Sequence, residues 1–268
     1  MRLSYSHLYT YAACPKRYWY TYREKLPTPL WWQASFGTSL HNALYRFTQE
    51  VQGTRLWKSL ENGLQQPSQM SLFFEATPTL PPIERLLELF DSAWVSVGYA
   101  DHAAMYAAKE EGMHLLRNWY MHHAKELLET VAVEIPFHEQ VGSCSIGGRI
   151  DRIDRRNNEL IVIDYKSGKL RSAEETALDL QLSLYALVLH DYLGLDSIAL
   201  ALYFLREDAL IETRRSKEQC EETRAYIHQV GKQITKEEFS PTPSPDTCTQ
   251  CPFRTLCPDS VCSSPSTE

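Results

Sequence analysis

The stretch ELIVIDYK, residues 159–166, decides the fold. Its apolar run from Leu160 to Ile163 is almost continuous, which is typical of a strand buried on both faces in the middle of a sheet. Because alternate side chains of a strand point to the same face, we expect Asp164 and Lys166 to lie side by side at its end. Such a pair is either a surface salt bridge or a metal ligand beside a water-activating amine.

The sequence on either side predicts the rest of a sheet. Residues 131–137 (VAVEIPF) and 145–155 (SIGGRIDRIDR) have the composition of two earlier strands, and turn residues at 156–158 connect the second to ELIVIDYK. These three strands are expected to form a meander. Downstream, the pattern predicts a helix over 178–194, strands over 197–205 and 209–215, and a closing helix over 216–234.

The N-terminal half is predicted to be helical. Ser4 or Ser6 can cap a first helix, and Pro15 suits the first turn of a second. Further helices are expected over 36–51, 81–97 and 101–129, with an irregular segment over 52–80. Helices followed by the order β-β-β-α-β-β-α indicate an α/β protein with one mixed sheet.

Composition sets the class of protein. With 268 residues, 43% of them hydrophobic and 23% charged, the chain is of ordinary globular type. It has no apolar run near the roughly 18 residues of a membrane span, and its start is too polar for a signal peptide. We therefore expect a cytoplasmic protein with no membrane partner.

Charge is distributed unevenly. The net charge of −7 argues against a protein that coats nucleic acid through bulk charge. Seven basic residues nevertheless fall within 23 residues, and they form either a solvated charged hairpin or a binding groove: Arg149, Arg152, Arg155, Arg156, Lys166, Lys169 and Arg171.

Two acids on neighbouring predicted strands suggest a metal site. Asp151 precedes the turn at 156–158 by about the distance at which Asp164 follows it, so the two carboxylates are expected to lie close enough to share Mg²⁺ or Mn²⁺. Lys166 would then stand beside the metal. On the following helix, Gln181 and Tyr185 are four residues apart and share one face.

Seven cysteines in a chain expected to be reduced suggest metal or cluster binding. CTQCPFRTLC (248–257) has the pattern C-x₂-C-x₅-C, which needs a fourth ligand to hold either zinc or an iron–sulfur cluster. Cys262 is near in sequence, and Cys14 lies far upstream. Cys144 and Cys220 are expected to be packing residues.

Five short motifs in this order resemble those of the PD-(D/E)XK nuclease superfamily, and more narrowly its RecB-like exonuclease branch, which includes CRISPR-associated exonucleases and the nuclease domains of helicase–nuclease complexes. They are the opening S-Y-S-H-L with its following C-P, G-x-x-x-H at 37–41, G-G-R-I-D at 147–151, D-Y-K at 164–166 and Q-x-x-x-Y at 181–185. The resemblance extends from Ser4 to Cys257.

The resemblance implies a restriction-endonuclease-like core, a central mixed sheet flanked by helices, with a helical N-terminal half and a C-terminal cysteine cluster. It implies a single nuclease domain over 1–258, made of a mainly helical part (1–130), a catalytic α/β core (131–240) and a cysteine segment (241–258) that closes onto Cys14. Residues 259–268 are expected to be a flexible tail.

The resemblance also implies roles for residues. The metal ligands would be His41, Asp151, Asp164 and the backbone carbonyl of Tyr165. Without the resemblance, the sequence favours a core histidine on an apolar helix face for His41. Lys166 would assist the attacking water, while Gln181 and Tyr185 would support the site or hold DNA. Glu134 is a candidate outer acid. A 4Fe–4S cluster would be held by Cys14, Cys248, Cys251 and Cys257, with Cys262 as the alternative ligand and zinc as the alternative metal.

The function implied is that of a metal-dependent DNA exonuclease acting on single-stranded ends in DNA repair, recombination or CRISPR-related processing. A helicase or CRISPR protein is a candidate partner. The chain has no phosphate-binding loop, so any helicase is expected to be another polypeptide. Two alternatives stay open. One is a DNA-end-binding structural subunit with little activity, and the other is a zinc-stapled binding module that is not an enzyme.

Overall fold

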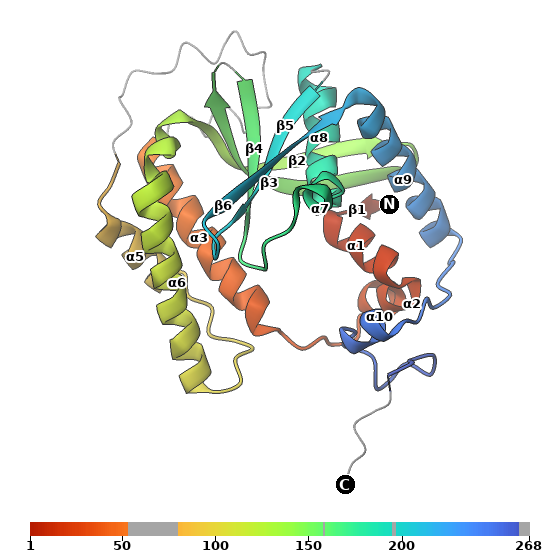
Figure 1. Ribbon diagram of the computed structural model, residues 1–268. Coiled ribbons are helices and arrows are strands. Elements are labelled where there is room, and N and C mark those ends of the chain that lie inside the picture. Colours follow the sequence, from red (N-terminus) through yellow and green to blue (C-terminus); the bar gives the residue numbers. More distant parts are fainter. Residues whose placement is uncertain (53–79, 158, 195–196, 263–268) are drawn as a thin grey trace. The chain divides into compact units, whose positions relative to one another are not determined.

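The described strands of the chain form one six-stranded mixed sheet (Figure 1). The computed structural model describes residues 1–52, 80–157, 159–194 and 197–262. The chain divides into two units, each described here by itself. Unit 1 comprises residues 1–29, 138–148 and 221–268, and unit 2 comprises residues 30–137 and 149–220. Most of the predicted irregular segment, 53–79, and the end of the predicted tail, 263–268, lie outside the described residues.

The strands follow the predicted order. β2 (Thr130–Val141), β3 (Cys144–Arg156) and β4 (Glu159–Lys166) form the predicted meander, and β5 (Ser197–Phe204) and β6 (Ala209–Ser216) continue the sheet. β3 and β4 are antiparallel, β4 and β5 are parallel, and β5 and β6 are antiparallel. The expectation of one mixed sheet in an α/β fold is thus confirmed.

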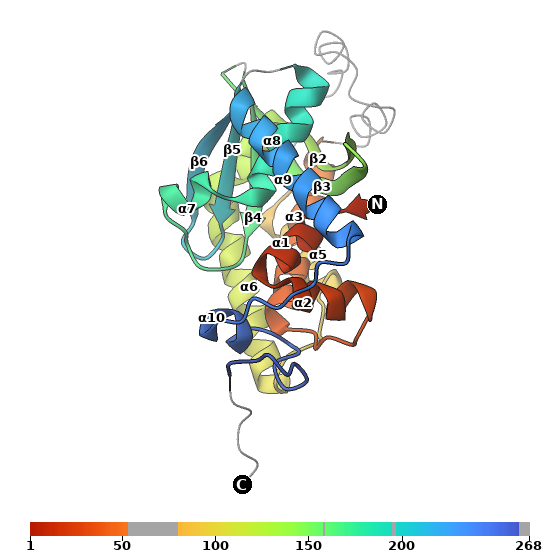
Figure 2. The same ribbon diagram turned by 90° about the vertical axis from the view of Figure 1, so that its right-hand side faces the viewer.

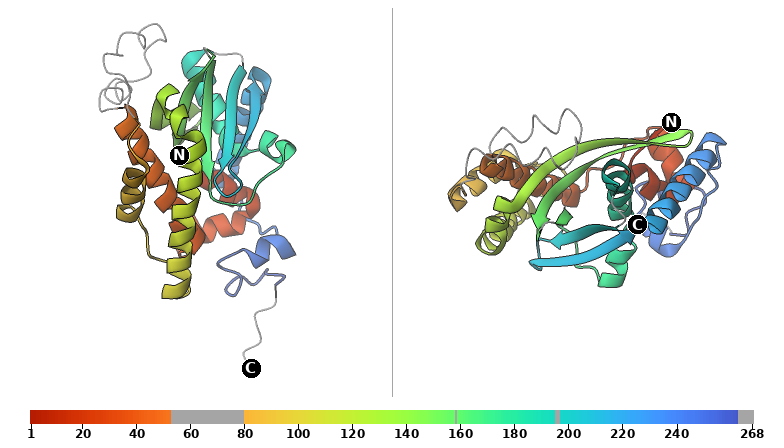
Figure 3. Two further views of the ribbon diagram at one scale, coloured as in Figure 1. Left: turned by 60° about the vertical axis from the view of Figure 1, so that its left-hand side comes forward. Right: turned by 90° about the horizontal axis from the view of Figure 1, so that it is seen from above.

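Three helices of unit 2 pack on one face of β4 and β5: α3 (Trp32–Gln52), α5 (Ile83–Ser92) and α6 (His102–His123) (Figure 3). Their buried side chains, among them Phe36, Phe90 and Trp119, form one cluster with Ile163 and Tyr165 of β4. The odd-numbered residues of β4 therefore face these helices, as strand alternation requires.

α8 (Leu180–Leu193) lies against β5 on the other side of the sheet. It contacts Asp164 and Lys166, the even-numbered residues at the end of β4. The Asp179 side chain caps its first turn by accepting from the Leu182 amide at 2.9 Å. Gly194 ends it in the left-handed conformation, at φ 63°. The short helix α7 (Ala173–Ala177) precedes it and begins with a capping box formed by Ser172 and Glu175.

Unit 1 contains the chain ends (Figure 2). The two-residue strand β1 (Arg2–Leu3) pairs in parallel with β3 at Ser145 and Ile146. It is followed by α1 (Tyr5–Ala13), α2 (Pro15–Tyr18) and the π-helical turn η1 (Trp19–Arg23), while α9 (Lys217–Thr235) and α10 (Pro245–Thr249) come from the C-terminal part. Pro15 occupies the first turn of α2, as predicted.

Two predicted helices end differently from expectation. α5 stops at Ser92 rather than at 97, because the Val95 amide leaves the helix and donates to Ser39 Oγ at 2.9 Å. The predicted helix over 101–129 is α-helical only as far as His123, and its last turn tightens into the 3₁₀ segment η3 (Ala124–Glu129). Among the described residues, no helix combines the length and the apolar character needed to cross a membrane.

Candidate active site

Asp151 and Asp164 face each other across the β3–β4 hairpin. The register pairs Arg152 with Ile163, so one further step brings Asp151 opposite Asp164. The Tyr165 amide donates to Asp151 Oδ2 at 3.2 Å, which ties the acid of β3 to the end of β4. The spacing about the turn predicted this juxtaposition, and the structure has it.

Asp164 and Lys166 also lie side by side, with Nζ 2.5 Å from Asp164 Oδ2. Lys166 donates to Gln181 Oε1 at 2.8 Å, and Gln181 Nε2 donates to the Tyr185 hydroxyl at 2.7 Å. That hydroxyl lies 3.0 Å from Asp164 Oδ1 and 2.9 Å from the Arg149 carbonyl, the two acceptors available to its one hydrogen. The four side chains therefore form a closed ring of polar contacts, in which α8 fixes both the acid and the lysine.

Burial sets the charge states in this ring. Asp164 is 1% exposed, and burial raises its pKa, with the negative charge of Asp151 acting in the same direction and Lys166 opposing it. Burial lowers the pKa of Lys166, but the adjacent Asp164 outweighs it and leaves the pKa above its ordinary value. The lysine is thus held as a cation, and it partly neutralises two closely spaced carboxylates.

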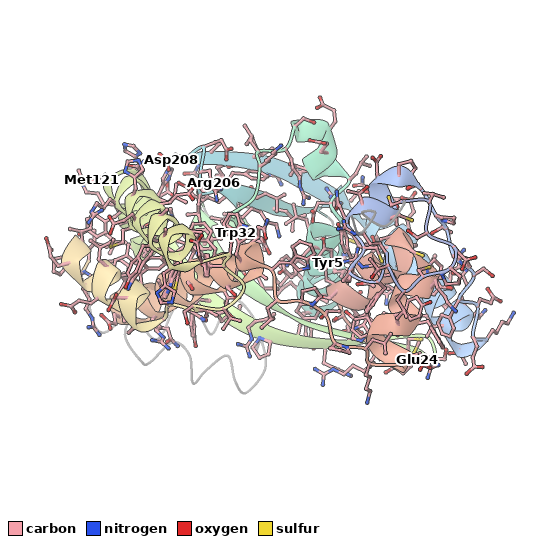
Figure 4. The ribbon with its side chains drawn as sticks, turned by 90° about the horizontal axis from the view of Figure 1, so that it is seen from below. Tyr5, Glu24, Trp32, Met121, Arg206 and Asp208 are labelled. Carbon is pink, nitrogen blue, oxygen red and sulfur yellow. The ribbon has the colours of Figure 1, made fainter. Side chains whose placement is uncertain are left out.

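His41 enters the site from α3, where its Nδ1 lies 3.2 Å from Asp151 Oδ2. Burial by itself lowers the pKa of His41, yet the hydrogen bond and charge of Asp151 raise it to about 8. One turn earlier, a Cβ added to Gly37 would lie 3.1 Å from Ser167 Oγ, so glycine lets α3 approach the loop that follows β4. Arg206, labelled in Figure 4, braces the same loop by donating to the Ser167 carbonyl at 2.8 Å.

Glu134 stands beside these acids. It is a non-glycine residue at φ 50° within β2, a left-handed conformation that L side chains rarely adopt. Burial raises the pKa of its carboxyl, and the charge of Asp151 raises it further. Arg149 Nη1 lies 3.2 Å from Glu134 Oε2. The structure therefore places the candidate outer acid within electrostatic reach of His41 and Asp151.

A buried ion pair that was not predicted from the sequence lies next to the site. Arg152 is 2% exposed and Asp154 is fully buried. Arg152 contacts both carboxylate oxygens of Asp154, at 2.7 and 2.5 Å, and donates to the Tyr165 hydroxyl at 2.8 Å. Tyr165 is the residue between Asp164 and Lys166, so this pair anchors the strand end from below.

The seven basic residues of the hairpin region are largely neutralised within unit 2. Five of them pair with acids: Arg149 with Glu134, Arg152 with Asp154, Arg156 with Glu212, Lys166 with Asp164 and Arg171 with Asp179. Because these five residues are paired with acids, they do not form the free basic groove that was one of the two alternatives for this stretch.

The side chains gathered at this site are of the types that bind a divalent cation. Asp164 Oδ2 is a buried oxygen without a hydrogen-bond partner, although Lys166 Nζ is close enough for an ion pair. Two carboxylates and a histidine are ligands that Mg²⁺ or Mn²⁺ accepts. Within the described ranges no three histidine, cysteine or acidic side chains are already arranged around one metal position. Here His41 pairs with Asp151, and Lys166 with Asp164, so a cation would have to displace these partners.

The cysteines assigned to a cluster lie together in unit 1. One cavity of about 20 Å³ is lined by Cys14, Cys248, Cys251 and Cys257, together with the cations Lys16, Arg17 and Arg254. Burial raises the pKa of the Cys251 thiol, with the charge of Arg17 acting in the opposite direction. The space holds about one water molecule, so the thiols would have to move apart to accept a cluster.

The remaining cysteines lie elsewhere. Cys262 Sγ is 3.3 Å from Thr249 Oγ1 and 3.6 Å from the Pro245 carbonyl, and it does not line the cavity. Cys144 and Cys220 are buried. Cys144 packs against Gly231 of α9 so closely that a Cβ on this glycine would overlap its sulfur. Both are therefore placed as the packing residues that the sequence predicted.

Two individual likenesses are among those found by comparison with known proteins. The chain is 29% identical over 133 residues to the Gene 69 protein of Mycobacterium phage L5, which covers 47% of this chain and 44% of that protein. The chain thus spans less than half the length of this relative. The crystal structure of SSO0001 is matched over 83% of this chain and 86% of that one, at 18% identity and a TM-score of 0.35, and this likeness supports no inference.

A family comparison covers almost the whole chain. The model of the PD-(D/E)XK nuclease superfamily matches residues 2–258, which include both units and every residue placed in the site above. The mixed sheet flanked by helices is consistent with the restriction-endonuclease-like fold expected of that superfamily. On this match, the chain belongs to the PD-(D/E)XK nuclease superfamily.

Proposed function

We propose that this protein is a metal-dependent DNA exonuclease of the RecB-like type that hydrolyses phosphodiester bonds from single-stranded ends. The observation that carries the proposal is the gathering of Asp151, Asp164, Lys166 and His41 at one end of the hairpin, with the buried Asp164 carboxylate against the Lys166 ammonium. Superfamily membership supports the nuclease chemistry.

The residues divide into two groups by chemistry. His41, Asp151, Asp164 and the Tyr165 carbonyl would hold Mg²⁺ or Mn²⁺. When bound, such a cation polarises a phosphodiester and lowers the pKa of a water. Lys166 supplies a positive charge beside the carboxylates and can donate to a phosphate oxygen or orient the attacking water.

Gln181 and Tyr185 act through others. Gln181 receives the Lys166 hydrogen bond and Tyr185 contacts Asp164, so the pair limits the positions that acid and lysine can adopt. Partners of this kind around a metal ligand typically affect activity 10- to 100-fold, although they do not touch the substrate.

The preference for ends is tested with matched DNA. Linear and circular single strands of the same sequence are incubated with the purified protein and Mg²⁺ or Mn²⁺, and released nucleotides are counted. We expect the linear strand to be degraded and the circle to persist. Equal rates on the two forms would reject the proposal that cleavage starts from ends, but not the proposal that the protein is a nuclease.

We further propose that the four cavity cysteines hold a 4Fe–4S cluster, which would join Cys14 to the segment 248–257. The cavity that the four cysteines share supports this assignment. Iron and sulfide are measured after anaerobic purification of Cys257→Ser and of its control, Cys262→Ser. We expect the first variant to lose iron and the second to keep it. Stoichiometric zinc without sulfide in the wild type would favour the zinc-stapled alternative.

A further inference from the structure

Residues 16–25, KRYWYTYREK, form the most basic and aromatic stretch of unit 1. They contain four cations, one acid and four aromatic rings, in a chain whose net charge is −7. Trp19–Arg23 adopt a π-helical turn, η1. This conformation is rare in proteins, and where it occurs it is often at a functional site. None of these residues belongs to the catalytic site proposed above.

A groove of about 480 Å³ opens on this stretch, lined by Lys16, Trp19, Arg23, Glu24, Glu237 and Phe239. Lys16 Nζ lies 4.1 Å from the centre of the Trp19 ring, and the Arg23 guanidinium lies 5.9 Å from that of Phe239. Trp19 and Phe239 are half-buried, whereas Arg23 and Glu24 are exposed. Figure 4 labels Glu24, the residue that follows η1.

The charge around the groove favours a polyanion. Its six lining residues are neutral in sum, and the charged residues that adjoin them in sequence, Arg17, Lys25, Lys236 and Glu238, add a net charge of +2. Single-stranded nucleic acid is held by this combination, in which cations follow the phosphates and aromatic rings stack on bases. Trp19 offers such a ring, and Lys16 and Arg23 are the cations nearest to the two rings.

We propose that this groove is a docking site for single-stranded nucleic acid, in which a base stacks on Trp19 and Lys16 and Arg23 contact phosphates. The choice of ligand rests on the proposed function, because the same strand would be the substrate of the nuclease. Lys16 also lines the cysteine cavity, so the docking site adjoins the proposed cluster ligands.

The charge contacts are tested in a Lys166→Met background, so that the DNA is not consumed. Binding of a labelled oligothymidylate is measured by fluorescence anisotropy at several salt concentrations. We compare Lys16→Gln/Arg23→Gln with Lys125→Gln/Lys217→Gln, which removes two charges from exposed positions of unit 2. Two lost phosphate contacts should reduce the slope of log K against log salt by about 1.4. Identical slopes and affinities for the two variants would overturn the proposal.

The stacking contact is tested at Trp19. Trp19→Leu should weaken oligonucleotide binding about tenfold, while Trp19→Phe, which keeps an aromatic face, should bind nearly as the wild type does. Circular dichroism verifies that both variants are folded. If Trp19→Leu binds as tightly as Trp19→Phe, or if polyglutamate competes as well as the oligonucleotide, the groove is not a nucleic-acid site.

Failure of this proposal and failure of the nuclease are distinguished with bis(p-nitrophenyl) phosphate, a diester too small to need a docking groove. If the wild type hydrolyses it and the groove variants bind DNA normally, the docking site is rejected and the nuclease stands. If the wild type does not hydrolyse it but the groove variants lose DNA binding, the docking site stands and the nuclease is rejected.

Discussion

Replacing Asp154 by alanine should destabilise unit 2 far more than any exposed ion pair does. Asp154 is fully buried and neutralises Arg152, which is 2% exposed. The substitution leaves the buried guanidinium with only the more distant carboxylate of Glu126, whose Oε2 lies 3.8 Å from Arg152 Nη2. It also removes the acceptor of the Thr130 hydroxyl, 2.8 Å away. Breaking one partner of a buried pair costs about 3–5 kcal/mol.

The control is the exposed pair of Glu159 with Arg214, which has similar geometry, with Arg214 Nη2 2.7 Å from Glu159 Oε2. Both side chains are about half exposed. The variant Glu159→Ala should therefore cost at most about 1 kcal/mol. The comparison isolates burial, because both variants delete a carboxylate that contacts an arginine.

The measurement is urea unfolding followed by circular dichroism, with the free energy of unfolding extrapolated to water for each variant. Restoring a neutral interior with Arg152→Met/Asp154→Leu should recover much of the lost stability, since such replacements of buried pairs are often neutral or stabilising. Equal losses for Asp154→Ala and Glu159→Ala would refute the reasoning.

Three further outcomes follow from the structure. The pKa of His41 is raised to about 8. The ion pair of protonated His41 with Asp151 therefore stabilises the metal-free protein fully below pH 6.5, and this stabilisation is lost as pH rises through 8. Mn²⁺ affinity should accordingly rise with pH up to about 8, and calorimetry should show this rise disappear in His41→Gln. Tyr185→Phe should lower DNA cleavage 10- to 100-fold, whereas Tyr120→Phe, whose hydroxyl donates to the Pro81 carbonyl, should not. Gly112→Ala should cost about 1–3 kcal/mol of unfolding free energy because its Cβ would overlap Phe90, and unchanged urea midpoints would contradict it.

Much of the site follows from the sequence because strand geometry is local. Alternation placed Asp164 beside Lys166, and the position of the turn placed Asp151 opposite them. Helical spacing placed Gln181 on the face of Tyr185. The first and third of these contacts depend on a period of 2 or 3.6 residues, and the second depends on a turn between strands that follow each other in sequence.

His41 needed more than periodicity, because its helix reaches the acids only through packing on β4. The spacing alone favoured a core histidine, and the resemblance of G-x-x-x-H supplied the metal-ligand role. The structure brings His41 to Asp151.

The features that the sequence did not predict depend on burial and on backbone exceptions. Arg152 was counted among exposed cations, because an arginine within an alternating strand normally faces water, yet its partner Asp154 makes an interior position tolerable. The φ of 50° at Glu134 and the π-helical turn at Trp19–Arg23 are departures from regular geometry that no periodic pattern indicates. β1 has two residues and α7 has five, too few for a period to be seen.

We propose that the acids and lysine at the end of the β3–β4 hairpin hydrolyse phosphodiesters. The most direct measurement compares the wild type with Lys166→Met and with the exposed control Lys125→Met, on end-labelled single-stranded DNA with Mn²⁺ under single-turnover conditions. We expect the wild type and Lys125→Met to release labelled nucleotides at the same rate, and the Lys166→Met rate to fall at least about 100-fold with its fold intact. Equal rates for all three proteins would contradict it.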